Sequence, residues 1–133
     1  MKQASFSWRI LGDVAVSFAS EGQIRDADWN PFVKELSDKP VRKYVSATLS
    51  NLEVNSVQRK AIIDVLRAKN ISVAVVTDDK LVIGMVTAAS WFGANVKAFS
   101  WANLDAALRH LSIADSMLQQ ITQTISTLRT KTR

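Results

Sequence analysis

The sequence predicts an α/β protein with an N-terminal β-hairpin, a βαβαβα succession whose helices pack on a mostly parallel sheet of four or five strands, and a C-terminal helical extension. Two observations support this prediction. From residue 41 onward, strand-like segments alternate with segments of helical periodicity, the order that builds a parallel sheet with right-handed crossovers. Residues 71–76 form a continuous apolar run between turn residues, which is typical of a strand buried on both faces.

The N-terminal part predicts a hairpin, a helix and a strand. Apolar and polar residues alternate over residues 6–19, and the Gly-Asp pair at 12–13 interrupts them with turn chemistry. This hairpin is expected to form an antiparallel edge of the sheet. Helical spacing of apolar residues then predicts a helix over residues 27–37, where Pro31 is tolerated in the first turn. The β-branched segment 41–49 predicts a strand.

The central part predicts further strands and helices in alternation. After a polar connection at 51–56, an apolar stripe predicts an amphipathic helix that ends near Asn70. Residues 81–92 are mainly apolar, interrupted by Gly84, Thr87 and Ser90, so periodicity alone does not assign them, but the length of the run and its Ala pair favour a helix. A short strand at 96–99 and a helix capped by Ser100 complete the α/β part.

The C-terminal part contains a row of apolar residues spaced alternately three and four apart, here called the heptad seam. The seam comprises Leu104, Ala107, Leu111, Ala114, Leu118, Ile121, Ile125 and Leu128. Such a narrow stripe predicts burial against another helix, and hence a homo-oligomer (dimer) or docking to a partner, as in a coiled coil. The residues expected to mediate oligomerisation are Leu111, Ala114, Leu118, Ile121, Ile125 and Leu128. Alternatively, Ser112 with Asp115 starts a new helix and divides the run.

The chain accordingly divides into an α/β domain at 1–112 and an amphipathic, basic extension at 113–133. The formal net charge of +5 comes from 17 basic and 12 acidic residues. The segment up to residue 115 contributes +2, because it holds 14 of the basic residues and all 12 acidic ones. No nucleic-acid-binding motif accompanies this excess, so no nucleic-acid partner is expected. Neither a secretory signal nor a membrane span is expected, and the absence of cysteine fits a cytoplasmic location.

Residues 71–111 carry a family resemblance. They contain a VAVV-x-DD strand end, an apolar helix, a short strand that ends in Phe99 and a terminal L-x-x-AL-x-x-L helix. In this order, the elements resemble the STAS-like superfamily, which has the anti-sigma-factor-antagonist fold, and within it a divergent bacterial branch related to CRAL-TRIO-type lipid-binding domains. The resemblance covers about residues 5 to 112. It implies a small, non-enzymatic module for signalling or binding.

The resemblance also implies where a regulatory site would lie. Phosphorylatable members carry an Asp-Ser pair in the loop that enters the helix after the second core strand, and the matching place is Asn55-Ser56. Ser56 keeps the hydroxyl group, whereas Asn55 replaces the acidic residue. Ser56 is therefore the candidate phosphorylation site, and Asn55, Ser56, Arg59 and Lys60 are the candidate partner-binding residues. The residues themselves favour a simpler interpretation, ordinary N-capping of the following helix.

Catalytic and metal-binding chemistry has few candidates. Asp78 and Asp79 follow the buried strand 71–76, and paired carboxylates there are able to hold Mg²⁺. The neighbouring loop offers no further carboxylate in the right place, so helix capping is the favoured interpretation. His110 is the only histidine, which argues against both a metal site and a Ser-His-Asp triad. The prediction is a protein that is not an enzyme, with no catalytic residue, metal or cofactor.

The aromatic residues suggest a second function class. The chain has four tryptophans, and Trp29, Met85, Trp91 and Phe92 are candidates to line an apolar ligand pocket, with core packing as the simpler alternative. The leading hypothesis is a cytoplasmic STAS-like regulatory module that binds a protein partner and self-associates or docks through its C-terminal helix. The alternative is a carrier or sensor of a small apolar ligand, such as a lipid or fatty acid, in a pocket of the same fold.

Overall fold

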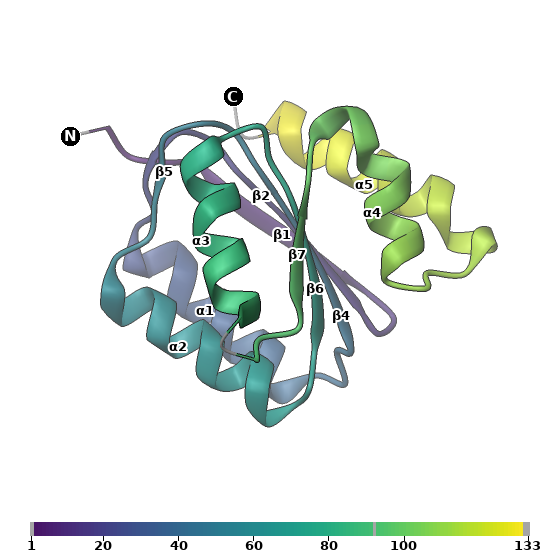
Figure 1. Cartoon of the computed structure of the whole chain (residues 1–133), viewed down its shortest axis with the longest axis horizontal. Helices are drawn as coiled ribbons and strands as arrows, with labels where there is room; N and C mark the ends of the chain where they lie inside the picture. The colour runs from purple at the N-terminus through teal and green to yellow at the C-terminus, as the bar shows by residue number, and fades with distance from the viewer. Residues whose placement is uncertain (1, 92, 132–133) are drawn as a thin grey trace.

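A central mixed sheet organises the computed structural model, which describes residues 2–91 and 93–131 (Figure 1). Its five strands, in spatial order, are β1 (Phe6–Leu11), β2 (Val14–Ala19), β4 (Lys43–Thr48), β6 (Ser72–Val76) and β7 (Val96–Phe99). The β1–β2 pair is the antiparallel hairpin, and every other neighbouring pair is parallel. The predicted α/β fold class, with its N-terminal hairpin and C-terminal helix, is confirmed.

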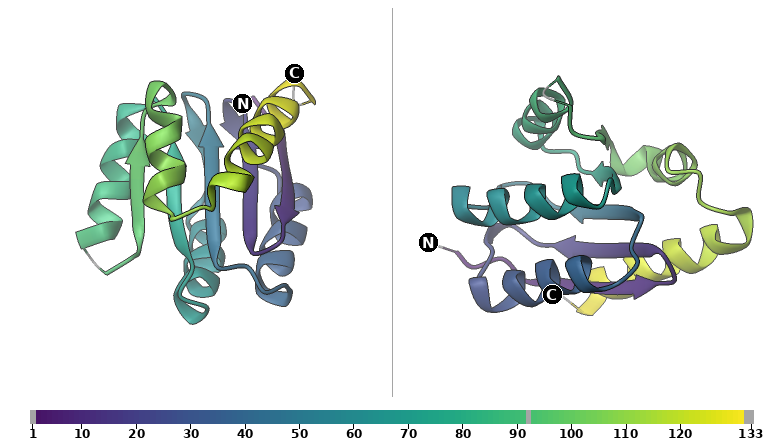
Figure 2. Two further views of the ribbon diagram at one scale, coloured as in Figure 1. Left: turned by 90° about the vertical axis from the view of Figure 1, so that its right-hand side faces the viewer. Right: turned by 90° about the horizontal axis from the view of Figure 1, so that it is seen from below.

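The helices cover both faces of the sheet. The three crossover helices are α1 (Asp26–Asp38), α2 (Ser56–Ala68) and α3 (Lys80–Trp91), and they lie on one face (Figures 1 and 2). Strand order advances in one direction from β2 to β7, so crossovers of a common hand place all three helices on the same side. After a 3₁₀ turn at Trp101–Asn103, α4 (Leu104–His110) and α5 (Asp115–Lys131) cover the other face.

Alternation along the strands divides the core into two clusters. In β2, Ala15 and Ala19 pack with Trp29 and Phe32 of α1, whereas Val16 and Phe18 belong to the cluster under α4 and α5. All six residues of β2 are buried. This burial on both faces follows from the position of β2 between β1 and β4, with a helix layer above and below.

A second, two-stranded sheet was not predicted. It pairs β3 (Gly22–Gln23) in parallel with β5 (Leu52–Glu53), within segments that the sequence suggests are breaks and polar connections. Gly22 has a φ of +116°, and a Cβ atom there would lie 2.5 Å from the carbonyl oxygen of Lys2. Only glycine fits this close approach, because it has no side chain.

The structure corrects the interpretation of the heptad seam. The helix stops at His110, Ser112 has a φ of +56°, and α5 begins at Asp115, so the run is divided as in the alternative prediction. Ala114 is exposed in the connection. Leu111, Ile121, Ile125 and Leu128 are buried with the sheet residues of their own chain, and Leu118 is partly buried beside them. The seam therefore needs no partner: α5 packs across β2 and β1.

The same packing bears on the predicted division at residue 112. That position coincides with the break between α4 and α5, yet both helices contribute to one cluster on the sheet.

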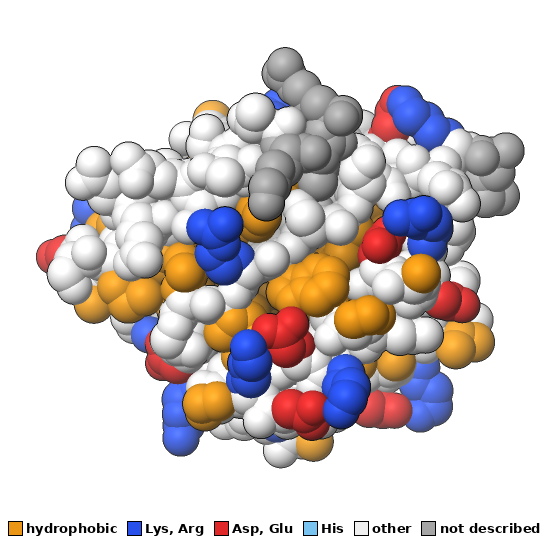
Figure 3. All heavy atoms as spheres, turned by 180° about the vertical axis from the view of Figure 1, so that it is seen from behind, with side chains coloured by type: hydrophobic (Ala, Val, Ile, Leu, Met, Phe, Trp, Pro, Cys, Tyr) orange, Lys and Arg blue, Asp and Glu red, His pale blue; other side chains and the backbone are white. Residues whose placement is uncertain are grey.

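No helix of the described residues is long and apolar enough to cross a membrane. The side of the molecule turned away in Figure 1 shows hydrophobic side chains between charges of both signs (Figure 3). The charge excess is therefore not gathered into a basic patch on that side.

Candidate functional site

An apolar cavity lies between the sheet and helices α2 and α3, and it is called here the α2–α3 cavity. Its volume is about 380 Å³. Val73, Val75 and Val96 of the sheet form part of its floor, and Ile62 and Val86 of the two helices form part of its walls. These side chains are aliphatic, so what they offer a ligand is mainly burial of hydrocarbon and dispersion contact.

Helix α3 is unusual for a surface helix and helps to explain the cavity. Its sequence is apolar around its whole circumference, yet Val82 is its only buried residue. Leu81 and Trp91 are 78% and 80% exposed. Its cavity-lining residues are Val82, Met85, Val86 and Ala89, and it packs beside β7. An all-round apolar helix is normally buried, so the exposed apolar surface of α3 is unusual.

Strand β4 contributes a row of hydroxyl groups to the cavity floor: Tyr44, Ser46 and Thr48, at alternate positions on one face. The Tyr44 hydroxyl shares a 2.6 Å hydrogen bond with the Ser17 hydroxyl. Burial raises the pKa of Tyr44, and hydrogen bonds from Ser17 and Ser46 oppose this shift only in part. The Thr48 hydroxyl is buried with no hydrogen-bond partner among the described residues. The floor thus holds neutral polar groups, one of them unsatisfied.

Polar residues of two kinds border the open side of the cavity. Arg59 and Arg67, two turns apart on α2, are exposed and line it. Neither guanidinium group has an ion pair within the part of the chain that the structure describes. Asn70 and Asn95 also line the cavity and are exposed, and the Asn95 amide donates a 2.7 Å hydrogen bond to the Ser72 hydroxyl. These groups are suited to an anionic or hydrogen-bonding end of a ligand.

The predicted pocket residues have different locations. Trp29 and Met85 line the cavity, and the Trp29 indole is fixed by a 3.0 Å hydrogen bond to the Gln58 carbonyl. Trp91 is not among the lining residues and points away into solvent. Phe92 lies outside the described residues.

The candidate regulatory residues lie at the start of α2, where the local structure is a capping box. The Asn55 side chain accepts a 2.8 Å hydrogen bond from the Gln58 backbone, and the Gln58 side chain accepts one from the Asn55 backbone. Ser56 is exposed in the first turn. Lys60 pairs with Asp64 on the outer side of the helix, whereas Arg59 borders the cavity. Capping accounts for Asn55, as the simpler interpretation expects.

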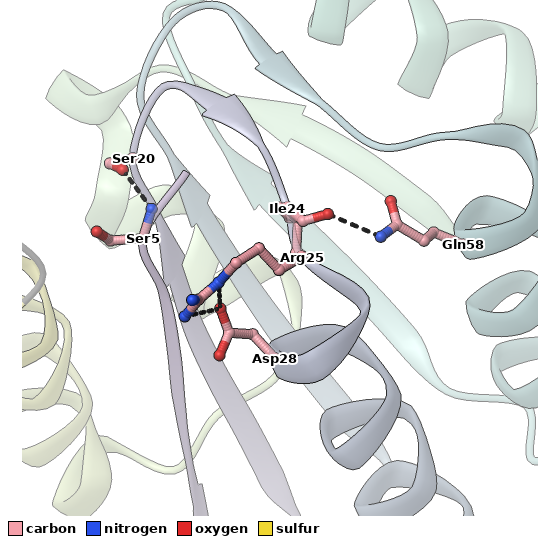
Figure 4. A network of polar contacts seen from close by, with 6 residues as sticks. All are labelled: Ser5, Ser20, Ile24, Arg25, Asp28 and Gln58. Carbon is pink, nitrogen blue, oxygen red and sulfur yellow. Dashed lines mark hydrogen bonds and ion pairs between the residues drawn. The ribbon is translucent and has the colours of Figure 1, made fainter. Parts of the chain in front are cut away.

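Gln58 is a structural residue that the sequence analysis missed. It is 2% exposed, and its side-chain amide donates to the Ile24 carbonyl at 2.8 Å (Figure 4) and to Asp26 at 2.9 Å. The Gln23 side chain donates to its oxygen at 3.2 Å. These bonds fasten the start of α2 to the start of α1 and so fix one end of the cavity. The capping-box spacing from Asn55 to Gln58 was the available signal, but it gives no sign of the contacts to α1.

The acidic pair and the histidine have local structural contacts. Asp79 accepts hydrogen bonds from the backbone of Leu81 at 2.9 Å and of Asn51 at 2.8 Å, and Asp78 accepts one from Trp101 at 3.1 Å. Among the described residues, no group of three or more potential metal ligands occurs. His110 is exposed and its ring lies 5.4 Å from that of Phe99. Helix capping, the favoured interpretation of the acidic pair, describes the Asp79–Leu81 bond at the start of α3, whereas the bonds to Asn51 and Trp101 join distant loops.

No family model, curated protein or solved structure matches the chain. The resemblance to the STAS-like superfamily therefore stays a prediction, and the geometry of the cavity carries the functional argument.

Proposed function

We propose that this protein is a non-enzymatic binding protein that carries or senses a small apolar ligand, such as a fatty acid or lipid chain, in the α2–α3 cavity. The main observation in support of this proposal is the cavity itself, which has a volume of about 380 Å³ and mainly aliphatic walls. This volume is within the range of about 300–1,000 Å³ that small-molecule sites occupy. The STAS-like resemblance, with its relation to lipid-binding domains, points the same way. We place the protein in the cytoplasm, in keeping with its lack of cysteine.

The exposure of the cavity walls to water favours a hydrocarbon ligand. The cavity is not sealed, because Met85, Arg59 and Arg67 at its border are exposed, so water reaches its aliphatic walls. A hydrocarbon chain covers the same walls without ordering water against them.

Native mass spectrometry of the chain purified from cells tests this proposal. We expect a fraction of the protein to carry an extra mass that is released on denaturation and behaves as a lipid. Lipid-free chain should also take up dodecanol, a neutral probe with a hydrocarbon chain. A clean ligand-free mass combined with no uptake of dodecanol would contradict the proposal.

Binding of a protein partner is the second candidate function, and the exposed apolar side chains of α3 favour it. Leu81 and Trp91 leave hydrocarbon surface in contact with water, which is typical of interaction sites. Self-association through the heptad seam is not part of this proposal, because Ile121 and Ile125 are buried within their own chain. A pull-down that compares the unmodified chain with Leu81→Ser tests it, since this substitution removes exposed surface without touching the core. Equal capture of every partner by both forms would exclude this face.

A further inference from the structure

The two ends of the α2–α3 cavity differ in exposure. At the end where α1 and α2 begin, the lining residues Ile24, Trp29 and Thr48 are buried and Arg59 is exposed. At the other end, where α2 finishes and β7 begins, the lining residues Arg67, Asn70 and Asn95 are exposed. The second end is therefore the more open and the more polar of the two. A ligand matched to both ends has a hydrocarbon tail and a polar head.

The distribution of charge indicates the sign of that head. Arg67 has no ion pair in the described part of the chain, and Asp64, the acidic residue of α2, is already paired with Lys60. Lys69 adds a second positive charge near this end of α2, where its ammonium group binds the carbonyl groups of Leu36 and Lys39. The open end thus offers a cation with no anion bound to it.

The opposite end of α2 is less suited to an anion. Arg59 follows Gln58, whose side chain is bonded to the carboxylate of Asp26 at 2.9 Å. The Asp79 carboxylate, bonded to the backbone of Asn51 at 2.8 Å, lies at the same edge of the sheet. Negative charges there repel a second anion.

The strand register gives the length available to the tail. Asn95 is bonded to Ser72, and Ser72 is level with Lys43 on the neighbouring strand. Thr48 lies at the other end of that strand, so the two ends of the cavity are separated by about 17 Å, at roughly 3.3 Å per residue. This length suits an extended single chain of medium size.

We propose that the ligand is a single-chain monocarboxylate whose carboxylate pairs with the Arg67 guanidinium beside Asn70 and Asn95, and whose tail extends toward Ile24 and Trp29. One guanidinium matches one carboxylate, because its parallel N–H groups bind both oxygens. This inference rests on the proposed function and assigns the ligand class and its direction in the cavity.

Calorimetric titration of dodecanoate and dodecanol into the full chain tests the assignment, because these probes share a tail and differ in the head. For Arg67→Gln we expect dodecanoate to bind about five- to tenfold more weakly, while dodecanol changes by less than about twofold. Arg9→Gln is the matched control: it makes the same substitution at an exposed residue of β1 outside the cavity lining, and it should leave both affinities unchanged. Added salt should weaken dodecanoate binding to the unmodified chain more than to Arg67→Gln.

Contradictory outcomes separate the two proposals. If both probes bind the unmodified chain and Arg67→Gln affects neither, the carboxylate is not at Arg67 and the apolar-ligand function stands. If Arg59→Gln weakens dodecanoate and Arg67→Gln does not, the ligand lies in the opposite direction. If neither probe binds the unmodified chain, the proposed function itself is overturned.

Discussion

At the scale of single residues, the hydroxyl row on β4 is the most informative feature. Central strands usually present aliphatic side chains to a helix layer, yet Tyr44, Ser46 and Thr48 face the α2–α3 cavity. Tyr44 is 3% exposed and keeps its hydroxyl neutral, because burial penalises the phenolate. Thr48 retains an unsatisfied hydroxyl.

Tyr44 gives a prediction about pH. It is the only tyrosine of the chain, so tyrosinate absorbance reports on it alone. We expect the folded protein to titrate above the ordinary pKa of 10.0, and the urea-unfolded protein to titrate near that value. Because the folded-state pKa is the higher one, the contribution of Tyr44 to stability is constant below about pH 10 and is lost as the pH rises further.

Tyr44→Phe is the control for this titration and should show no tyrosinate signal. A folded-state titration at or below the ordinary value would mean that the Tyr44 hydroxyl is solvated, contrary to the described packing.

At the residue level, sequence reasoning named some of the cavity residues and missed those that act through distant contacts. Trp29 and Met85 line the cavity, Trp29 as a buried residue of α1 and Met85 as an exposed one at the border, and their role as ligand contacts stays a prediction. Gln58 was missed since its partners Ile24 and Asp26 are more than thirty positions away. Trp91 was misplaced because an apolar helix gives no periodicity that distinguishes its inner from its outer side.

At the scale of elements, α5 shows that an apolar stripe can be predicted correctly while the surface it packs against is not. The spacing of Ile121, Ile125 and Leu128 does mark one buried stripe, as predicted. Spacing defines the face that is buried, however, and not what buries it. Here the sheet of the same chain does so, and the turn at Ser112 redirects the helix across β2.

The packing of α5 gives a prediction about stability. Ile125 is 2% exposed, so Ile125→Ala should lower the free energy of unfolding by about 2–4 kcal/mol in urea denaturation. The neighbouring exposed Ser126→Ala is the matched control, with a change within about 0.5 kcal/mol. Light scattering should give the same mass for both variants and the unmodified chain. A dimer that becomes a monomer in Ile125→Ala with unchanged unfolding would instead favour the seam as an interface.

Helix α3 shows that an element can be predicted from sequence while its environment is not. Its existence was predicted from the length of the apolar run and its Ala pair. Its environment was not, since a continuous apolar run normally indicates a buried element. The partial exposure of α3 arises from its position over the edge strand β7, where no further helix of the described residues covers it.

At the scale of the whole molecule, the arrangement of layers accounts for both the core and the cavity. With α4 and α5, the sheet face beneath them forms a closely packed cluster, and α1 closes the hairpin side of the opposite face. The space between α2 and α3 is what remains open on that face. The alternation of strands and helices in the sequence predicted the layers. The cavity depends instead on the volumes of the side chains where the helix layer meets the sheet, and only the aromatic residues gave a sequence signal for it.

Two adjacent positions on α3 provide the most direct test of the central claim, that the α2–α3 cavity is a ligand site. Ala89 lines the cavity, whereas its neighbour Ala88 is exposed and does not. Phenylalanine at either position has the same helix propensity, but only at 89 does it fill the cavity. The decisive measurement is the dissociation constant for dodecanol in Ala89→Phe and Ala88→Phe. We predict roughly tenfold weaker binding or more in Ala89→Phe and a change within about twofold in Ala88→Phe. Equal affinities in the two variants would contradict the account.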